Sequence, residues 1–133
     1  MPPGTAFLAI AAVYGASGVA LGAFGAHGLR NHLSPAALET WQTAVTYHLI
    51  HTLALLAVGI WLRLGPGVPS AAGYPEGTLV TAGWSFTLGV LMFSGSLYAL
   101  ALGGPRVLGP VTPLGGVAFI AGWLALLWAA FRS

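Results

Sequence analysis

The four histidines of this 133-residue sequence all fall between positions 27 and 51, so this stretch has the highest density of side chains that could do chemistry. His48 and His51 are three positions apart and therefore share one face of a helix, and neutral imidazole is a common ligand of zinc, copper and haem iron. Two such ligands are too few for a site. A tight hairpin before His48 would add His27 and His32, and all four would then lie near one end of the helices.

A second interpretation of the same stretch needs no metal. Glu39 lies within reach of Arg30 or His32 across the hairpin, so a carboxylate and an imidazole could relay protons there. In the simplest case Glu39 is an exposed charge, and the histidines and Tyr47 hydrogen-bond to helix ends and lipid headgroups. The sequence predicts a ligand or proton site, with any metal unidentified, among His27, His32, Glu39, Tyr47, His48 and His51.

Residue patterns that mark catalysis or nucleic-acid binding are missing. The sequence has no cysteine, which excludes disulfides, thiolate metal sites and a cysteine nucleophile. Ser94 and Ser96 flank a glycine but lack the Gly-x-Ser-x-Gly pattern of a hydrolase nucleophile. Four arginines without any lysine do not make the basic surface that nucleic acid requires. We therefore expect a protein that is not an enzyme and that binds no nucleic acid.

The elements that position these residues must lie in a membrane. Only 5% of the residues are Asp, Glu, Lys or Arg, against about 25% in soluble domains, and the mean hydropathy is +0.88. Uncharged stretches of about 20 residues are long enough to cross the hydrocarbon core as helices. No Lys or Arg precedes the first stretch, and it is longer than the core of a signal peptide, so we expect it to stay attached.

Capping residues and prolines predict where the helices begin and end. Thr5 and Thr112 are predicted N-caps, and Ser34 caps a helix that starts at Pro35. Residues 64 to 77 are rich in proline and glycine and form a loop. We expect a single domain, 1–133, folded as an all-α, up-down-up-down, four-helix membrane bundle. Its predicted spans are about 6–26, 43–63, 78–102 and 112–131, with a short interfacial helical segment before the second.

Two rows of small residues indicate how these helices associate. At spacings of three and four, small side chains let membrane helices approach closely. The first row consists of Gly15, Gly18, Gly22 and Gly25, and the second of Gly115, Ala118 and Gly122. The rows favour a non-enzymatic packing or accessory subunit, bound to a second copy of itself or to another membrane protein. The alternatives are a protein that binds a metal, haem, quinone or lipid headgroup at the histidines, and an oligomeric transporter or channel.

The chain before the fourth span is a further candidate site. A helix that starts near Thr112 presents free amides, and Arg106 is close in sequence, so an anion or a lipid headgroup could bind there. The arginines leave the orientation open, because Arg63 and Arg132 on one side of the membrane balance Arg30 and Arg106 on the other.

Several motifs resemble those of one family. They are GAFGAHGL at 22–29, YHLIH at 47–51, FSGSLY at 93–98, TPLGG at 112–116 and GW at 122–123. In this order and spacing they resemble the domain-of-unknown-function 423 family of small bacterial inner-membrane proteins of the YgdD and YwdK type, which also has mitochondrial relatives. The resemblance implies four transmembrane helices, an inner-membrane location and no agreed activity. This chain has His48 where the family pattern has glutamine. The departure weakens any metal site that needs His48, and it leaves His27 and His51 as the better family-matched polar pair.

Overall fold

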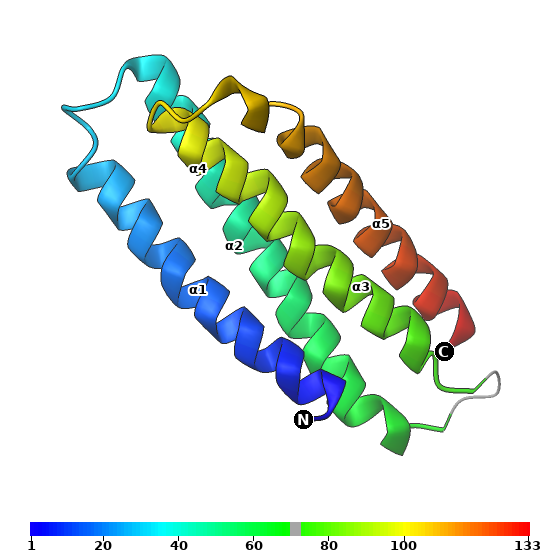
Figure 1. Cartoon of the computed structure of the whole chain (residues 1–133). Helices are drawn as coiled ribbons and strands as arrows, with labels where there is room; N and C mark the ends of the chain where they lie inside the picture. The colour runs from blue at the N-terminus through cyan, green and yellow to red at the C-terminus, as the bar shows by residue number, and fades with distance from the viewer. Residues whose placement is uncertain (70–72) are drawn as a thin grey trace.

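The computed structural model describes residues 1–69 and 73–133, and these residues form helices joined by short turns (Figure 1). The helical elements are α1 (Pro3–His27), α2 (Pro35–Leu64), η1 (Gly65–Gly67), α3 (Glu76–Gly89), η2 (Val90–Ser94), α4 (Gly95–Ala101), η3 (Arg106–Leu108) and α5 (Val111–Arg132). Within the described chain, four helical stretches are long and apolar enough to cross a membrane, which confirms the predicted four-span bundle. Of the predicted loop 64–77, residues 70–72 lie outside the described residues.

The four spans run antiparallel to their neighbours, with α2 and the α3–η2–α4 span in the centre (Figure 1). α1 lies along one side of this central pair and α5 along the other. The central spans are correspondingly more buried within the protein than the two flanking ones. The core consists of large apolar side chains from all four spans, among them Phe7, Leu55, Leu79, Phe86 and Phe119.

Both rows of small residues are in contact with helices of the same chain. Gly18 of α1 packs on Leu49 of α2, and a Cβ atom at Gly25 would come within 2.5 Å of the Trp41 ring. In α5, Gly115 packs on the backbone of Phe93, and Gly122 packs on the ring of Phe86. The rows therefore act as helix contacts inside the bundle.

The predicted helix starts are right in one case and wrong in two. Ser34 caps α2, since its Oγ accepts a hydrogen bond of 3.1 Å from the Ala37 amide. Thr5 and Thr112 are not caps, because α1 already starts at Pro3 and α5 at Val111, in each case after a proline that occupies the cap position. Proline fits these starts because its fixed φ angle suits a first helical turn and its missing N–H would have no partner there. The Thr5 hydroxyl instead accepts a hydrogen bond from Arg63.

The third span contains an irregularity that we did not predict. Residues Val90–Ser94 form a π-helical turn, η2, and the Gly95 amide bonds to the Val90 carbonyl five residues earlier. Ser94, the last residue of this turn, is completely buried, and its Oγ donates a 2.7 Å hydrogen bond to the Ala44 carbonyl of α2. Turns of this kind often occur at functional sites. Because Ser94 bonds to Ala44, the turn lies where the two central spans are joined by a polar contact.

Candidate functional site

The four histidines do not form one cluster. His27 and His32 are exposed at the end of the bundle where α1 meets α2, and Glu39 is exposed one turn into α2. His48 and His51 lie about 20 and 24 Å along α2 from its first residue, at 1.5 Å per residue, which places them near its middle. The expectation that all four lie near one membrane interface is therefore wrong, because α2 continues unbroken from Pro35. The described residues contain no group of three or more His, Cys, Asp or Glu side chains that could hold a metal.

His48 joins three helices through both of its ring nitrogens. Its Nε2 lies 2.8 Å from the Tyr14 carbonyl, which can only accept, so Nε2 carries the proton and donates. Its Nδ1, 2.9 Å from the Tyr98 hydroxyl, then accepts from that group in the neutral ring. Ser17 is 3.3 Å from Nε2, but a protonated nitrogen cannot act as its base. This arrangement is a polar cross-link and does not activate a serine nucleophile.

His51 has the opposite tautomer. Its Nδ1 donates to the Tyr47 carbonyl at 2.8 Å, and its Nε2 lies 3.1 Å from the Trp123 indole nitrogen. Because an indole N–H can only donate, Nε2 must be the unprotonated acceptor. The ring also stacks on Phe119, with centroids 3.6 Å apart and planes at 9°. A metal at Nε2 would have to displace the Trp123 bond.

A large groove opens beside His51. It lies between α2, η2 and α5, has a volume of about 680 Å³, and carries no charged side chain. We call it the α2–α5 groove. Its lining consists of Thr46, Tyr47, Ile50, His51, Phe93, Pro113, Gly116, Val117, Phe119, Ile120 and Trp123. Phe119 and Trp123 were not among the predicted site residues, although their spacing of four places them on one helix face.

Tyr47 differs from the other three tyrosines. The hydroxyls of Tyr14, Tyr74 and Tyr98 each bond to another part of the chain, at 2.8, 3.1 and 2.9 Å. The Tyr47 hydroxyl has no such partner among the described residues, and its side chain is 41% exposed in the α2–α5 groove. An unpaired donor at membrane depth is costly, because lipid chains offer no acceptor. The groove therefore presents one free hydrogen-bond donor among aromatic rings.

Thr112 and Arg106, the predicted anion site, have separate surroundings. The Ser96 hydroxyl donates its proton to the Phe93 carbonyl, so its oxygen can accept a hydrogen bond from the neighbouring Thr112 hydroxyl. Arg106 is exposed in η3. The Thr112 hydroxyl thus joins α5 to α4.

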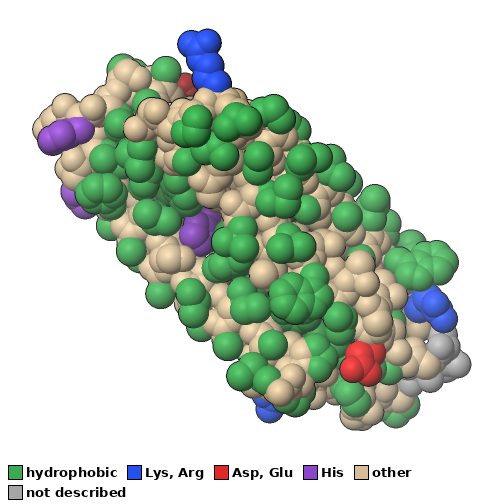
Figure 2. Space-filling view, viewed as in Figure 1, with side chains coloured by type: hydrophobic (Ala, Val, Ile, Leu, Met, Phe, Trp, Pro, Cys, Tyr) green, Lys and Arg blue, Asp and Glu red, His purple; other side chains and the backbone are tan. Residues whose placement is uncertain are grey.

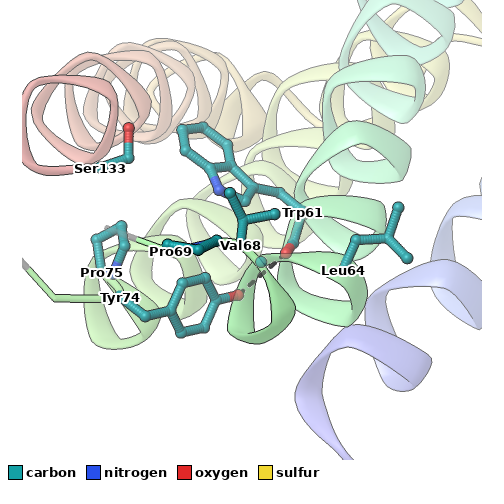
Figure 3. A pocket seen from close by; sticks show the side chains of 8 residues that line it. Trp61, Leu64, Val68, Pro69, Tyr74, Pro75 and Ser133 are labelled. Atoms are coloured by element: carbon teal, nitrogen blue, oxygen red, sulfur yellow. Dashed lines mark hydrogen bonds between the residues drawn. The ribbon is translucent and has the colours of Figure 1, made fainter. Parts of the chain in front are cut away.

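A smaller pocket of about 270 Å³ lies at the end of the bundle that holds both termini (Figure 3). The Tyr74 hydroxyl donates to the Trp61 carbonyl across it, and Ser133 lies at its edge (Figure 3). Burial raises the pKa of Tyr74, and the charge of Glu76 raises it further. Tryptophan and tyrosine commonly anchor membrane proteins at this level.

On the face shown in Figure 2, charged side chains lie toward the two ends of the molecule, and many hydrophobic side chains and a histidine lie between them. This distribution fits a helical bundle whose middle faces lipid chains and whose ends face headgroups and water.

Comparisons with known proteins agree with this architecture. A family model described as "Protein of unknown function (DUF423)" matches residues 21–116. The chain is 42% identical over 126 residues to the UPF0382 membrane protein SSP2132 of Staphylococcus saprophyticus, covering 95% of this chain and 97% of that protein. It is 40% identical to the UPF0382 membrane protein YwdK of Bacillus subtilis, with 95% of each chain covered. A UPF0382 membrane protein of Haemophilus influenzae is 38% identical, over 96% of this chain and 94% of that protein. No solved structure matches.

Proposed function

The chain belongs to the DUF423 family of membrane proteins, and from its geometry we propose a binding function for it. The protein binds a lipid-soluble molecule with a planar, carbonyl-bearing head, of the quinone class, in the α2–α5 groove. It catalyses no reaction there, and it resides in the plasma membrane of a bacterium. The observation that carries this proposal is the Tyr47 hydroxyl, a hydrogen-bond donor without a partner in an aromatic groove at membrane depth.

The aromatic rings of the groove suit a planar head. The Tyr47 ring lies nearly parallel to the His51 ring, with planes at 12° and centroids 5.9 Å apart, and His51 in turn stacks on Phe119. Phe93 completes this set, with its centroid 4.6 Å from that of Tyr47. His51 and Phe119 are buried, so a flat ligand would stack on the accessible faces of Tyr47 and Phe93, from which a flexible acyl chain gains less.

The polar groups of the groove suit a carbonyl oxygen. Trp123 and His51 satisfy each other, and the Thr46 hydroxyl donates to the Gln42 carbonyl of its own helix. Tyr47 is left as the one donor, and it needs an acceptor that can enter from the lipid. A quinone carries such an oxygen on a planar ring, and its apolar tail can leave through the open side of the groove.

The metal and haem alternatives have less support. A metal ligand must present a free nitrogen lone pair, and the unprotonated nitrogens of His48 and His51 already accept hydrogen bonds from Tyr98 and Trp123. The two rings also join different sets of helices, so they do not converge on one point.

Quenching of tryptophan fluorescence tests the proposal directly. The purified protein in lipid nanodiscs is titrated with a short-chain ubiquinone analogue, and saturable quenching is expected because Trp123 lines the groove. Trp123→Phe removes the saturable component. Trp84→Phe is the matched control, because Trp84 is equally exposed, 49% against 46%, but lies outside the groove.

The hydrogen bond has its own variant in the same titration. Tyr47→Phe keeps the ring and removes the donor, so the affinity should fall about fivefold, the effect of one net hydrogen bond of about 1 kcal/mol. Quenching that rises linearly without saturation, or that is lost equally in Trp84→Phe, would contradict the proposal.

A second candidate function, an accessory or self-associating subunit, is favoured by the outer face of α1. Five alanines follow one another along this face at helical spacing and are all exposed: Ala9, Ala12, Ala16, Ala20 and Ala23. Such a row suits close contact with another membrane helix. Ala16→Leu should lower any dimer or complex seen on gentle extraction. A particle of unchanged mass in that variant, or of monomer mass in the wild type, would remove this candidate.

A further inference from the structure

A second groove lies where α1 and α2 pack together. It consists of two hollows of about 360 and 290 Å³, which share Gly25, Ala26 and Gln42 and so form one continuous feature. We call it the α1–α2 groove. It extends from Leu38 to Thr46, about 12 Å along α2 at 1.5 Å per residue. It therefore begins at the end of the bundle and continues toward the middle.

The character of the lining changes along the groove. The outer hollow is lined by two polar residues, Arg30 and Gln42. The inner hollow is bounded by Gly22, Val45 and the ring of Trp41, whose N–H is already bonded to the Leu21 carbonyl at 2.9 Å. Polar groups thus lie at headgroup level and apolar groups lie deeper. An amphiphile has the same order of polarity along its length.

The polar groups of the outer hollow are free. Neither the Arg30 guanidinium nor the Gln42 carboxamide has a hydrogen-bond or ion-pair partner among the described residues. Glu39, the acidic residue of the same region, is exposed but does not line the groove. An unpaired guanidinium beside a neutral donor is suited to a phosphate, because both offer N–H groups and neither repels its charge.

We infer that the α1–α2 groove is a phospholipid site. The phosphodiester lies against Arg30 and Gln42, and one acyl chain lies along Gly22, Val45 and Thr46. The depth of the inner hollow argues against a free anion, because a soluble anion would gain nothing from apolar contacts within the bilayer. This site is independent of the α2–α5 groove, which has a different lining apart from Thr46.

Native mass spectrometry can test the inference on the intact protein. The detergent-solubilised chain is mixed with equal amounts of phosphatidylglycerol, phosphatidylethanolamine and diacylglycerol that carry the same acyl chains. One phospholipid per chain should remain bound, while diacylglycerol should not. Arg30→Gln should weaken the affinity for the phospholipids about tenfold in a lipid titration, the effect of losing a hydrogen bond to a charged group.

Two further variants make the test specific. Arg106→Gln removes the same charge at the same end of the bundle but outside the groove, and should leave occupancy unchanged. Ala26→Phe places a ring where the two hollows join and should block the acyl chain without removing any charge. Agreement of both variants with these expectations supports the site.

Three results would overturn the inference. Diacylglycerol bound as well as the phospholipids would show that the phosphate plays no part. Equal losses in Arg30→Gln and Arg106→Gln would show attraction to the general charge of that end. Displacement of the phospholipid by millimolar glycerol 3-phosphate would assign the site to a soluble anion instead of a lipid.

Discussion

Two adjacent glycines of α5 allow the packing of the bundle to be tested with a matched pair of variants. A Cβ atom at Gly115 would lie 2.7 Å from the Cα of Phe93, closer than real Cβ contacts, and the obstacle is backbone that cannot rotate away. A Cβ atom at Gly116 would meet only the Phe93 ring, at 3.9 Å, which is an ordinary contact. Gly115→Ala should therefore push α5 away from η2, whereas Gly116→Ala should be accommodated.

The expected difference in stability follows from the two terms involved. Both variants gain the same helix propensity of alanine over glycine, up to about 1 kcal/mol, so this term cancels in the comparison. Overpacking against a rigid neighbour costs about 1–3 kcal/mol and applies only to Gly115→Ala. Gly115→Ala should thus unfold with a free energy about 1–3 kcal/mol below that of Gly116→Ala.

The assay is reversible unfolding by sodium dodecyl sulfate in mixed micelles, followed by circular dichroism and by tryptophan fluorescence. The emission of Trp123 gives a second readout, because displacement of α5 should weaken its bond to His51. Free energies of unfolding that agree within about 0.5 kcal/mol, the usual scatter of neutral substitutions, would refute the close packing of α5 on η2.

Three further predictions concern the polar contacts. His48→Gln should keep the stability within about 0.5 kcal/mol of the wild type, since a carboxamide can also donate to α1 and accept from α4, while His48→Leu should lose about 1–3 kcal/mol in the same unfolding assay. Ser94→Ala should cost about 0.6 kcal/mol and at most about 1.7, the range measured for interhelical hydrogen bonds in membranes, because only its bond to Ala44 is lost. The pKa of Tyr74 is raised above its ordinary 10.0, so at high pH its phenol is still neutral in the folded protein when it has already ionised in the unfolded chain. The stability of the protein should therefore fall as the pH rises above about 10. Tyr74→Phe should make this fall smaller, as measured by thermal unfolding at a series of pH values.

Hydropathy, together with the capping residues, prolines and glycines at helix ends, predicted the spans because a membrane permits few backbone conformations. Long uncharged stretches must be helices there, since the backbone has no other way to satisfy its hydrogen bonds. Ser34 before Pro35 marked the start of α2 correctly. The prediction was wrong at Thr5 and Thr112 because prolines two or three residues earlier start these helices without a side-chain cap.

The candidate site could be predicted only in part. Tyr47 and His51 stood out as polar residues on an apolar helix, but their surroundings depend on α5, which is distant in sequence. The depth of His51 was misjudged because the interfacial segment and the second span are one continuous helix. The π-helical turn also leaves no local pattern, since it depends on how η2 packs between α2 and α5.

Photoaffinity labelling with a short-chain quinone that carries a photoreactive group on its ring tests the binding proposal most directly. If the head binds in the α2–α5 groove, peptide mapping should place the label on residues 46–51 and 113–123, and excess unmodified quinone should suppress it. Label spread over the outer face of α1, or label that excess quinone does not suppress, would contradict the proposal.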